Sequence, residues 1–190
     1  GRNPAPAKPD PAVAALSLPE FTLTTQDGGR FELNDLRGRV TIVDFMFTNC
    51  PFVCPVLTQH LRGVSNLLVG TPVRFLSITV DPEHDTPEAL SAYAQMHEAD
   101  TERWTFGTTG DAGIVRRILT DHLKFAIEDD PKNPITLPGG KMMNNIVHPS
   151  WFLLVGPDAR PLGIYRSSDE GQRKALAERA RVVAGAIQRR

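Results

Sequence analysis

The sequence predicts an α/β fold in which parallel strands are joined by helices. Two β-branched, apolar runs at 40–47 and 73–80 are each followed by a segment with apolar residues at helical spacing. Two shorter apolar runs near the C-terminus flank a Gly-Pro-Asp turn, and an amphipathic stretch follows them. Strands that alternate with helices favour a parallel sheet with right-handed crossovers.

Length and charge restrict the class of protein. The chain has 190 residues, of which 41% are apolar, enough for one domain with a single core. Its formal net charge is -1 and it contains no basic run of five or more residues, so nucleic acid and anionic membrane surfaces are not expected partners. No stretch of 18 or more apolar residues occurs, so no membrane-spanning segment is expected within this sequence.

The first 18 residues differ in composition from the rest. They are rich in proline and alanine, which predicts a flexible linker over 1–18 and a folded domain over 19–190. Such a linker suits a tether, so we expect a signal sequence or a membrane anchor upstream of it.

The first elements are a hairpin, a strand and a helix. Alternating runs at Phe21–Leu23 and Phe31–Leu33 flank Asp27-Gly28-Gly29, which is typical of a hairpin. Val40–Phe47 is apolar almost throughout and predicts a central strand buried on both faces. Helical spacing over Val56–Leu68, preceded by a proline suited to a first helical turn, predicts a helix directly after it.

The same patterns define the rest of the chain. They predict, in order, a strand at 73–80, a helix at 86–98, a helix at 111–123, a polar insert at about 128–145, strands at 151–155 and 161–165, and a helix at about 169–187. A strand–helix–strand unit followed by a hairpin and a terminal helix has the order of the thioredoxin fold. Here it carries an added N-terminal β-hairpin and a polar loop insert before the last hairpin.

The two cysteines, Cys50 and Cys54, lie where the central strand leads into the first helix. The helix dipole and free N–H groups at such a junction stabilise a thiolate and lower the pKa of a thiol. Three intervening residues allow the sulfurs either to form a disulfide or to bind one metal ion. Two inert core thiols are the alternative, but the proline-flanked spacing at a strand-to-helix junction favours a reactive pair.

Two thiolates suit Cu(I) or zinc, but a third ligand is needed to hold either ion well. His148 is the candidate, because it precedes the strand at 151–155, where a thioredoxin fold brings the chain close to the cysteine loop. An ordinary loop histidine remains the alternative. The other four histidines are expected at the surface or at helix ends: His60, His84, His97 and His122.

Two further groups could bind metal by residue type. Met142 and Met143 carry soft thioether donors near His148, although loop methionines more often pack loosely against the surface. Asp81, Glu83 and Asp85 surround His84, but the prolines beside them predict a turn and a helix N-terminus instead of a hard-metal site.

Two motifs carry a resemblance to a known family. The segment 48–55, Thr-Asn-Cys-Pro-Phe-Val-Cys-Pro, resembles the T-x-C-P-x-x-C-P signature of the Sco/SenC family of copper proteins, which act in cytochrome c oxidase assembly. The segment 77–87 is similar to the S-V-D-P-x-x-D-T-P run of that family. His148, nine residues before Pro157, matches the position of the single histidine ligand of the family.

The resemblance implies a thioredoxin-like fold and a copper site formed by Cys50, Cys54 and His148. It also implies a periplasmic or other extracytoplasmic location, with tethering to a membrane through the N-terminal linker. The expected partners are the copper-bearing subunit of cytochrome c oxidase and other copper chaperones or thiol reductants. One position departs from the family, since Val147 stands where an Asp usually precedes the histidine. Loss of that carboxylate could alter copper affinity or redox preference.

Three functions remain open at this point. The first is a copper chaperone, a carrier of Cu(I) and possibly of Cu(II), that passes the metal to oxidase thiols by ligand exchange. The second is a thiol-disulfide oxidoreductase in which Cys50 attacks and Cys54 resolves, which needs no histidine. The third is a thiol peroxidase, because Thr48 precedes the first thiol as a threonine does in peroxiredoxins. Prolines after both cysteines favour a metal or disulfide pair over the peroxidase.

Overall fold

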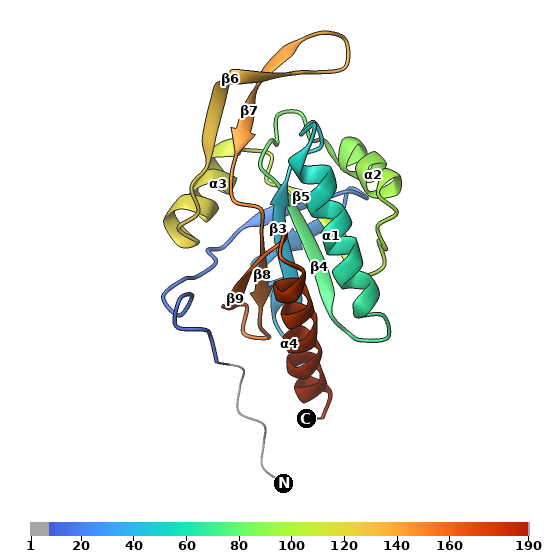
Figure 1. The fold of residues 1–190 in the computed structure, drawn as a ribbon, viewed down its shortest axis with the longest axis vertical. Helices are drawn as coiled ribbons and strands as arrows, with labels where there is room; N and C mark the ends of the chain where they lie inside the picture. The colour runs from blue at the N-terminus through green and yellow to red at the C-terminus, as the bar shows by residue number, and fades with distance from the viewer. Residues whose placement is uncertain (1–7, 190) are drawn as a thin grey trace.

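The computed structural model describes residues 8–189, which form a central sheet with helices on both faces (Figure 1). The strands are β1 (Thr22–Thr25), β2 (Arg30–Glu32), β3 (Thr41–Met46), β4 (Arg74–Thr79), β5 (Trp104–Thr108), β6 (Glu128–Thr136), β7 (Met142–Val147), β8 (Trp151–Val155) and β9 (Pro161–Arg166). The helices are η1 (Leu33–Leu36), α1 (Val53–Leu67), α2 (Pro87–Met96), α3 (Ala112–Arg117), η2 (Ile118–His122) and α4 (Glu170–Gln188).

Seven strands form one mixed sheet in the order β2-β1-β5-β4-β3-β8-β9. The neighbours β3 and β4 are parallel, as are β4 and β5, so the helices between them cross over in the predicted manner. At one edge β1 pairs antiparallel with both β2 and β5, and at the other β8 pairs antiparallel with β3 and β9. The predicted α/β class, the N-terminal hairpin and the C-terminal hairpin with its helix are confirmed.

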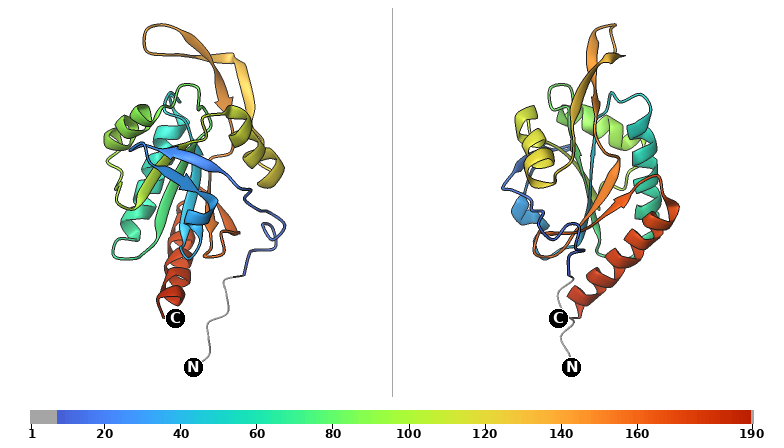
Figure 2. Two further views of the ribbon diagram at one scale, coloured as in Figure 1. Left: turned by 180° about the vertical axis from the view of Figure 1, so that it is seen from behind. Right: turned by 60° about the vertical axis from the view of Figure 1, so that its left-hand side comes forward.

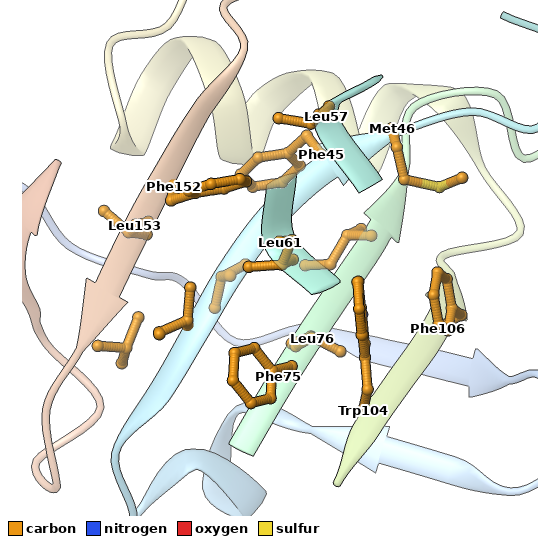
Figure 3. Close-up of a cluster of buried hydrophobic side chains, with 14 of the residues drawn as sticks. Phe45, Met46, Leu57, Leu61, Phe75, Leu76, Trp104, Phe106, Phe152 and Leu153 are labelled. Atoms are coloured by element: carbon orange, nitrogen blue, oxygen red, sulfur yellow. The ribbon is translucent and has the colours of Figure 1, made fainter. Parts of the chain in front are cut away.

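The helices divide between the two faces of the sheet. In Figure 2, α1 and α4 lie along one face and α3 covers the other. Leu57 and Leu61 of α1 contribute to the core beside aromatic side chains of the strands (Figure 3). The stacked rings of Trp104 and Phe106 on β5, 5.2 Å apart, extend this core along the sheet. Burial of these side chains fixes α1, and therefore its N-terminus, against the end of β3.

Strand β5 was not predicted from the sequence. It is short and contains Gly107, which weakens a strand pattern. The structure explains this glycine, because a Cβ atom there would lie 2.9 Å from Cδ1 of Leu23 on β1. A side chain at position 107 would therefore require the Leu23 side chain on the neighbouring strand to move.

The predicted polar loop at 128–145 is wrong in detail, because the segment forms an antiparallel hairpin of β6 and β7 that projects beyond the main sheet (Figure 1). Buried Ile135 and Ile146 anchor it to the core. Its pairing is irregular between Asp130 and Ile135, where two prolines lie. A bulge tolerates prolines that a regular strand excludes, which is why the sequence resembles a loop.

The predicted linker covers residues 1–18, of which residues 1–7 lie outside the described part of the chain. Residues 8–18 lie against the domain: Val13 is buried, the Asp10 N–H donates to the Leu162 carbonyl at 2.9 Å, and Arg179 pairs with the Asp10 carboxylate at 2.8 Å. A boundary at residue 18 therefore marks a change of composition, and the attached part begins earlier. No helix within 8–189 is long and apolar enough to cross a bilayer.

Candidate metal and thiol site

The two cysteines lie at the start of α1, directly after β3. The Cys50 N–H donates to the Phe47 carbonyl at 3.4 Å, which turns the chain sharply out of the strand. The Cys54 N–H donates to the Cys50 Sγ, also at 3.4 Å, as expected for a sulfur at a helix N-terminus. Both thiols are free, with Cys50 9% exposed and Cys54 1% exposed. Cys50 is therefore the sulfur that a partner reaches first.

The two thiols differ strongly in acidity. A hydrogen bond from the Cys54 thiol, supported by the N–H groups of Cys54, Phe52 and Val53, lowers the pKa of Cys50 to about 6, although burial opposes this. The same hydrogen bond, together with burial and the nearby Cys50 charge, raises the pKa of Cys54 well above its usual range. At neutral pH the pair therefore holds one thiolate at Cys50 and one proton at Cys54.

His148 lies between β7 and β8 and faces the same pocket as the thiols. This pocket has a volume of about 110 Å³ and is lined by Phe47, Cys50, Pro51, Phe52, Val53, Cys54, Asn145, Ile146, Val147 and His148. Burial lowers the pKa of His148, so the imidazole is neutral at physiological pH. Its Nδ1 lies 3.2 Å from the Pro149 carbonyl, which can only accept, so Nδ1 carries the proton and Nε2 keeps a free lone pair.

The pocket brings the three predicted residues together without closing a metal site. Within residues 8–189, no three His, Cys, Asp or Glu side chains converge closely enough to hold a metal ion. The donor types nevertheless suit a soft ion, since they comprise a thiolate, a second thiol and a neutral imidazole. Binding would require loss of the Cys54 proton and approach of the His148 loop. Two larger hollows, of about 620 and 580 Å³, contain no cysteine.

The buried carboxyl group of Asp85 holds the segment that leads into the thiol loop. Asp85 is fully buried and accepts from the Thr48 N–H at 3.0 Å, from the Thr48 hydroxyl at 2.5 Å and from the Thr79 hydroxyl. Burial raises the pKa of Asp85, and these donors oppose that effect. The sequence predicted a turn and a helix N-terminus here, so this anchoring role was missed. Because the Thr48 hydroxyl proton is committed to Asp85, the structure disfavours a peroxidase role for Thr48.

The remaining candidate ligands lie elsewhere. His84 contacts the Asp81 carboxylate at 2.9 Å, and the His97 ring packs on Tyr93 with centroids 4.2 Å apart. Neither they nor His60 and His122 line the thiol pocket. Met142 and Met143 line the hollow of about 580 Å³ beside the loop that follows β4. Position thus separates His148 from every other histidine.

Comparison with known proteins identifies the family. The family model SCO1/SenC matches residues 10–184. The chain belongs to the SCO1/SenC family. An SCO1 protein homolog of Bacillus subtilis (strain 168) is 32% identical over 147 residues, which cover 76% of this chain and 71% of that protein. A relative from Stutzerimonas stutzeri, 29% identical over 154 residues that cover 80% of this chain and 70% of that protein, is named a putative copper-binding protein, and BsSco is described as a member of the Sco family of cytochrome c oxidase assembly proteins.

Solved structures share the fold of this SCO1/SenC protein. A SCO1/SenC family lipoprotein from Bacillus anthracis str. Ames aligns with a TM-score of 0.77 at 26% identity, covering 90% of this chain and 97% of that one. BsSco, a member of the Sco family of cytochrome c oxidase assembly proteins in which a disulfide switch is described, gives 0.74 at 27% identity, with coverage of 93% and 97%. Yeast Sco1 with copper bound gives 0.68 at 24% identity, covering 86% of each chain. The thioredoxin-like fold is therefore confirmed.

Proposed function

We propose that this protein carries copper through Cys50, Cys54 and His148 and delivers it to the copper site of cytochrome c oxidase during assembly. The observation that supports the proposal is the shared pocket, which is lined by a low-pKa thiol, a second thiol and a neutral imidazole. Family relatives described with bound copper or as oxidase assembly proteins point to the same cargo and the same partner.

Each of the three residues has a defined part in the proposal. Cys50 is the first donor, because its thiolate is present at neutral pH and is the more exposed of the two sulfurs. Cys54 supplies the second sulfur after it loses its proton, so uptake of a cation releases a proton. His148 offers Nε2, while its Nδ1–H bond to Pro149 fixes the ring tautomer. Cu(I) is a soft ion that this donor set suits.

The proposed setting follows the family. One bacterial relative is described as a lipoprotein, which fits a membrane-tethered, extracytoplasmic location. We infer that copper arrives from another copper chaperone, that a thiol reductant keeps the cysteines reduced, and that the copper-bearing oxidase subunit receives the metal. Val147 leaves His148 without a carboxylate directly before it in the chain, so the histidine depends on the Pro149 carbonyl for orientation.

Anaerobic Cu(I) titration against a competing chelator tests the copper site. We expect one equivalent to bind the reduced protein, with affinity at least about tenfold weaker in His148→Ala, because a ligand has more effect than a residue that only orients one. His122→Ala is the matched control, since His122 lies outside the thiol pocket. Equal affinity in the wild type and His148→Ala would remove His148 from the site. Weak binding in all three proteins would refute the chaperone proposal.

A thiol-disulfide oxidoreductase is the second candidate, favoured by the division of acidity between the two thiols. The Cys50 thiolate would attack a partner disulfide, and Cys54 would then lose its proton and resolve the mixed disulfide. Two electrons pass to the partner, whose cysteines leave as thiols. Exchange activity that survives in His148→Ala while copper affinity falls would support this activity beside the chaperone. Loss of exchange in Cys54→Ser, with a trapped mixed disulfide at Cys50, would confirm the assigned order of attack.

A further inference from the structure

Exposed apolar side chains surround the mouth of the thiol pocket. Phe52, between the two cysteines, is 80% exposed, the highest value for a large apolar side chain in residues 8–189. Val53 and Val147 are each more than half exposed, and Pro51 is also exposed. We call these four residues, which all line the pocket, the apolar rim. Exposed apolar groups gathered around a reactive sulfur indicate a contact surface, because burying them against a partner is favourable.

The lining of the thiol pocket indicates whether the groups that enter it are charged. Of the ten residues that line the thiol pocket, none is Asp, Glu, Lys or Arg. A charged side chain packed against this lining would lose its hydration, and only the Cys50 sulfur could offset that loss. The side chains that flank the group in contact with the sulfur are therefore uncharged.

Pocket size and backbone indicate the shape of the occupant. A volume of about 110 Å³ holds a single side chain and no folded element. Strand β7 pairs only with β6 in the described chain, so its other edge is open. On β7 the Ile146 N–H donates to the Asn145 side-chain oxygen at 2.9 Å, and Ile146 lies in the pocket wall. An extended segment can pair with such an edge while one side chain enters the pocket.

We propose that the apolar rim recognises an extended, uncharged segment of a partner protein in which a cysteine stands next to a large apolar residue. The cysteine enters the thiol pocket, and its apolar neighbour packs on Phe52. The inference rests on the proposed thiol and copper chemistry and adds the class of segment on which that chemistry acts. It differs from charge-guided docking, since the contact is expected to be insensitive to salt.

Disulfide exchange with two synthetic peptides tests the selectivity. Each peptide contains two cysteines three residues apart, joined by a disulfide, with leucines beside the cysteines in one and serines in the other. The reduced protein is oxidised to its Cys50–Cys54 disulfide while the peptide disulfide gains two electrons and becomes a dithiol. We expect the leucine peptide to react roughly tenfold faster than the serine peptide, with little change of the ratio between low and high salt.

Three variants assign the selectivity to the rim. Phe52→Ser should bring the ratio of the two rates close to one, and Phe52→Leu should retain most of the preference. Val182→Ser is the matched control, because Val182 is 58% exposed on α4 and lines no part of the thiol pocket. The backbone N–H of residue 52, which helps to lower the pKa of Cys50, is present in both Phe52 variants.

The outcomes separate the inference from the proposed function. Equal rates for both peptides in the wild type, or a ratio unchanged by Phe52→Ser, would overturn the inference even when a small disulfide such as hydroxyethyl disulfide is reduced normally. Failure to reduce that small disulfide as well would refute the dithiol chemistry itself and the inference with it. A covalent dimer formed in preference to either peptide adduct would identify a second copy of this chain as the occupant and would also overturn it.

Discussion

Asp44 is a buried carboxyl group whose ionisation should control how stability depends on pH. It lies on β3, is 0% exposed, and accepts a hydrogen bond from Ser77 through Oδ1. Ser77 is held in turn by the Trp104 indole N–H at 2.8 Å. Within residues 8–189, the Asp44 Oδ2 has no hydrogen-bond partner. Burial therefore dominates and raises the pKa of Asp44 to about 7.

The sign of the effect follows from proton linkage. Between about pH 4, where an unfolded Asp titrates, and about pH 7, the folded protein keeps a proton that the unfolded chain has lost. The free energy of unfolding contributed by Asp44 therefore falls as pH rises through this window and is constant above it. Complete ionisation of Asp44 lowers the free energy of unfolding by about 4 kcal/mol. About 2 to 3 kcal/mol of this loss falls between pH 5 and pH 8.

Asp44→Asn removes this titration. We expect the stability of the variant relative to the wild type to increase by about 2 to 3 kcal/mol between pH 5 and pH 8, whatever constant offset the amide introduces. Urea denaturation of the reduced proteins at both pH values measures the difference. Glu20→Gln is the control, because Glu20 is exposed. A difference between Asp44→Asn and wild type that is the same at both pH values would refute the argument that burial keeps Asp44 protonated.

Two further predictions concern the thiols and the sheet. Iodoacetamide should alkylate Cys50 with a midpoint near pH 6, and Cys54→Ala should move this midpoint to higher pH, since the Cys54 thiol is the main donor to the thiolate. A midpoint unchanged in the variant would assign the effect to the backbone N–H groups instead. Gly107→Ala should destabilise by about 1 to 3 kcal/mol in urea, because the new methyl group would meet Leu23. Gly63→Ala on α1, with open space around it, should instead stabilise by about 0.5 to 1 kcal/mol, and similar results for both would contradict the steric account.

The thiol half of the candidate site could be predicted because its geometry is local. Cys50 and Cys54 are four residues apart at a strand-to-helix junction, and both the strand and the helix have clear apolar periodicity. Their shared pocket with His148 depends on a contact across nearly 100 residues of chain. Position before a strand made His148 the candidate ligand but left an ordinary loop histidine as the alternative, and the family resemblance was needed to favour the ligand role.

The anchoring residues were harder to predict. Asp85 follows a turn and precedes a helix, so its local sequence explains it without any role at the thiol loop. Asp44 interrupts an apolar strand, and a sequence does not show whether such a carboxyl group finds a partner. Only the packing of β4 and α1 against β3 determines that Asp85 meets Thr48 and that Asp44 is left with one free oxygen.

The sequence by itself determined the α/β class, the order of most elements and the reactive pair, because periodicity and helix-terminus chemistry act over a few residues. Tertiary structure alone decided the β6–β7 hairpin, the place of β5 in the sheet and the meeting of His148 with the thiols. It also decided that Phe52 and Val147 lie exposed at one mouth. These features depend on which distant surfaces bury one another, and the free energy of that burial belongs to the assembled core and to no single segment.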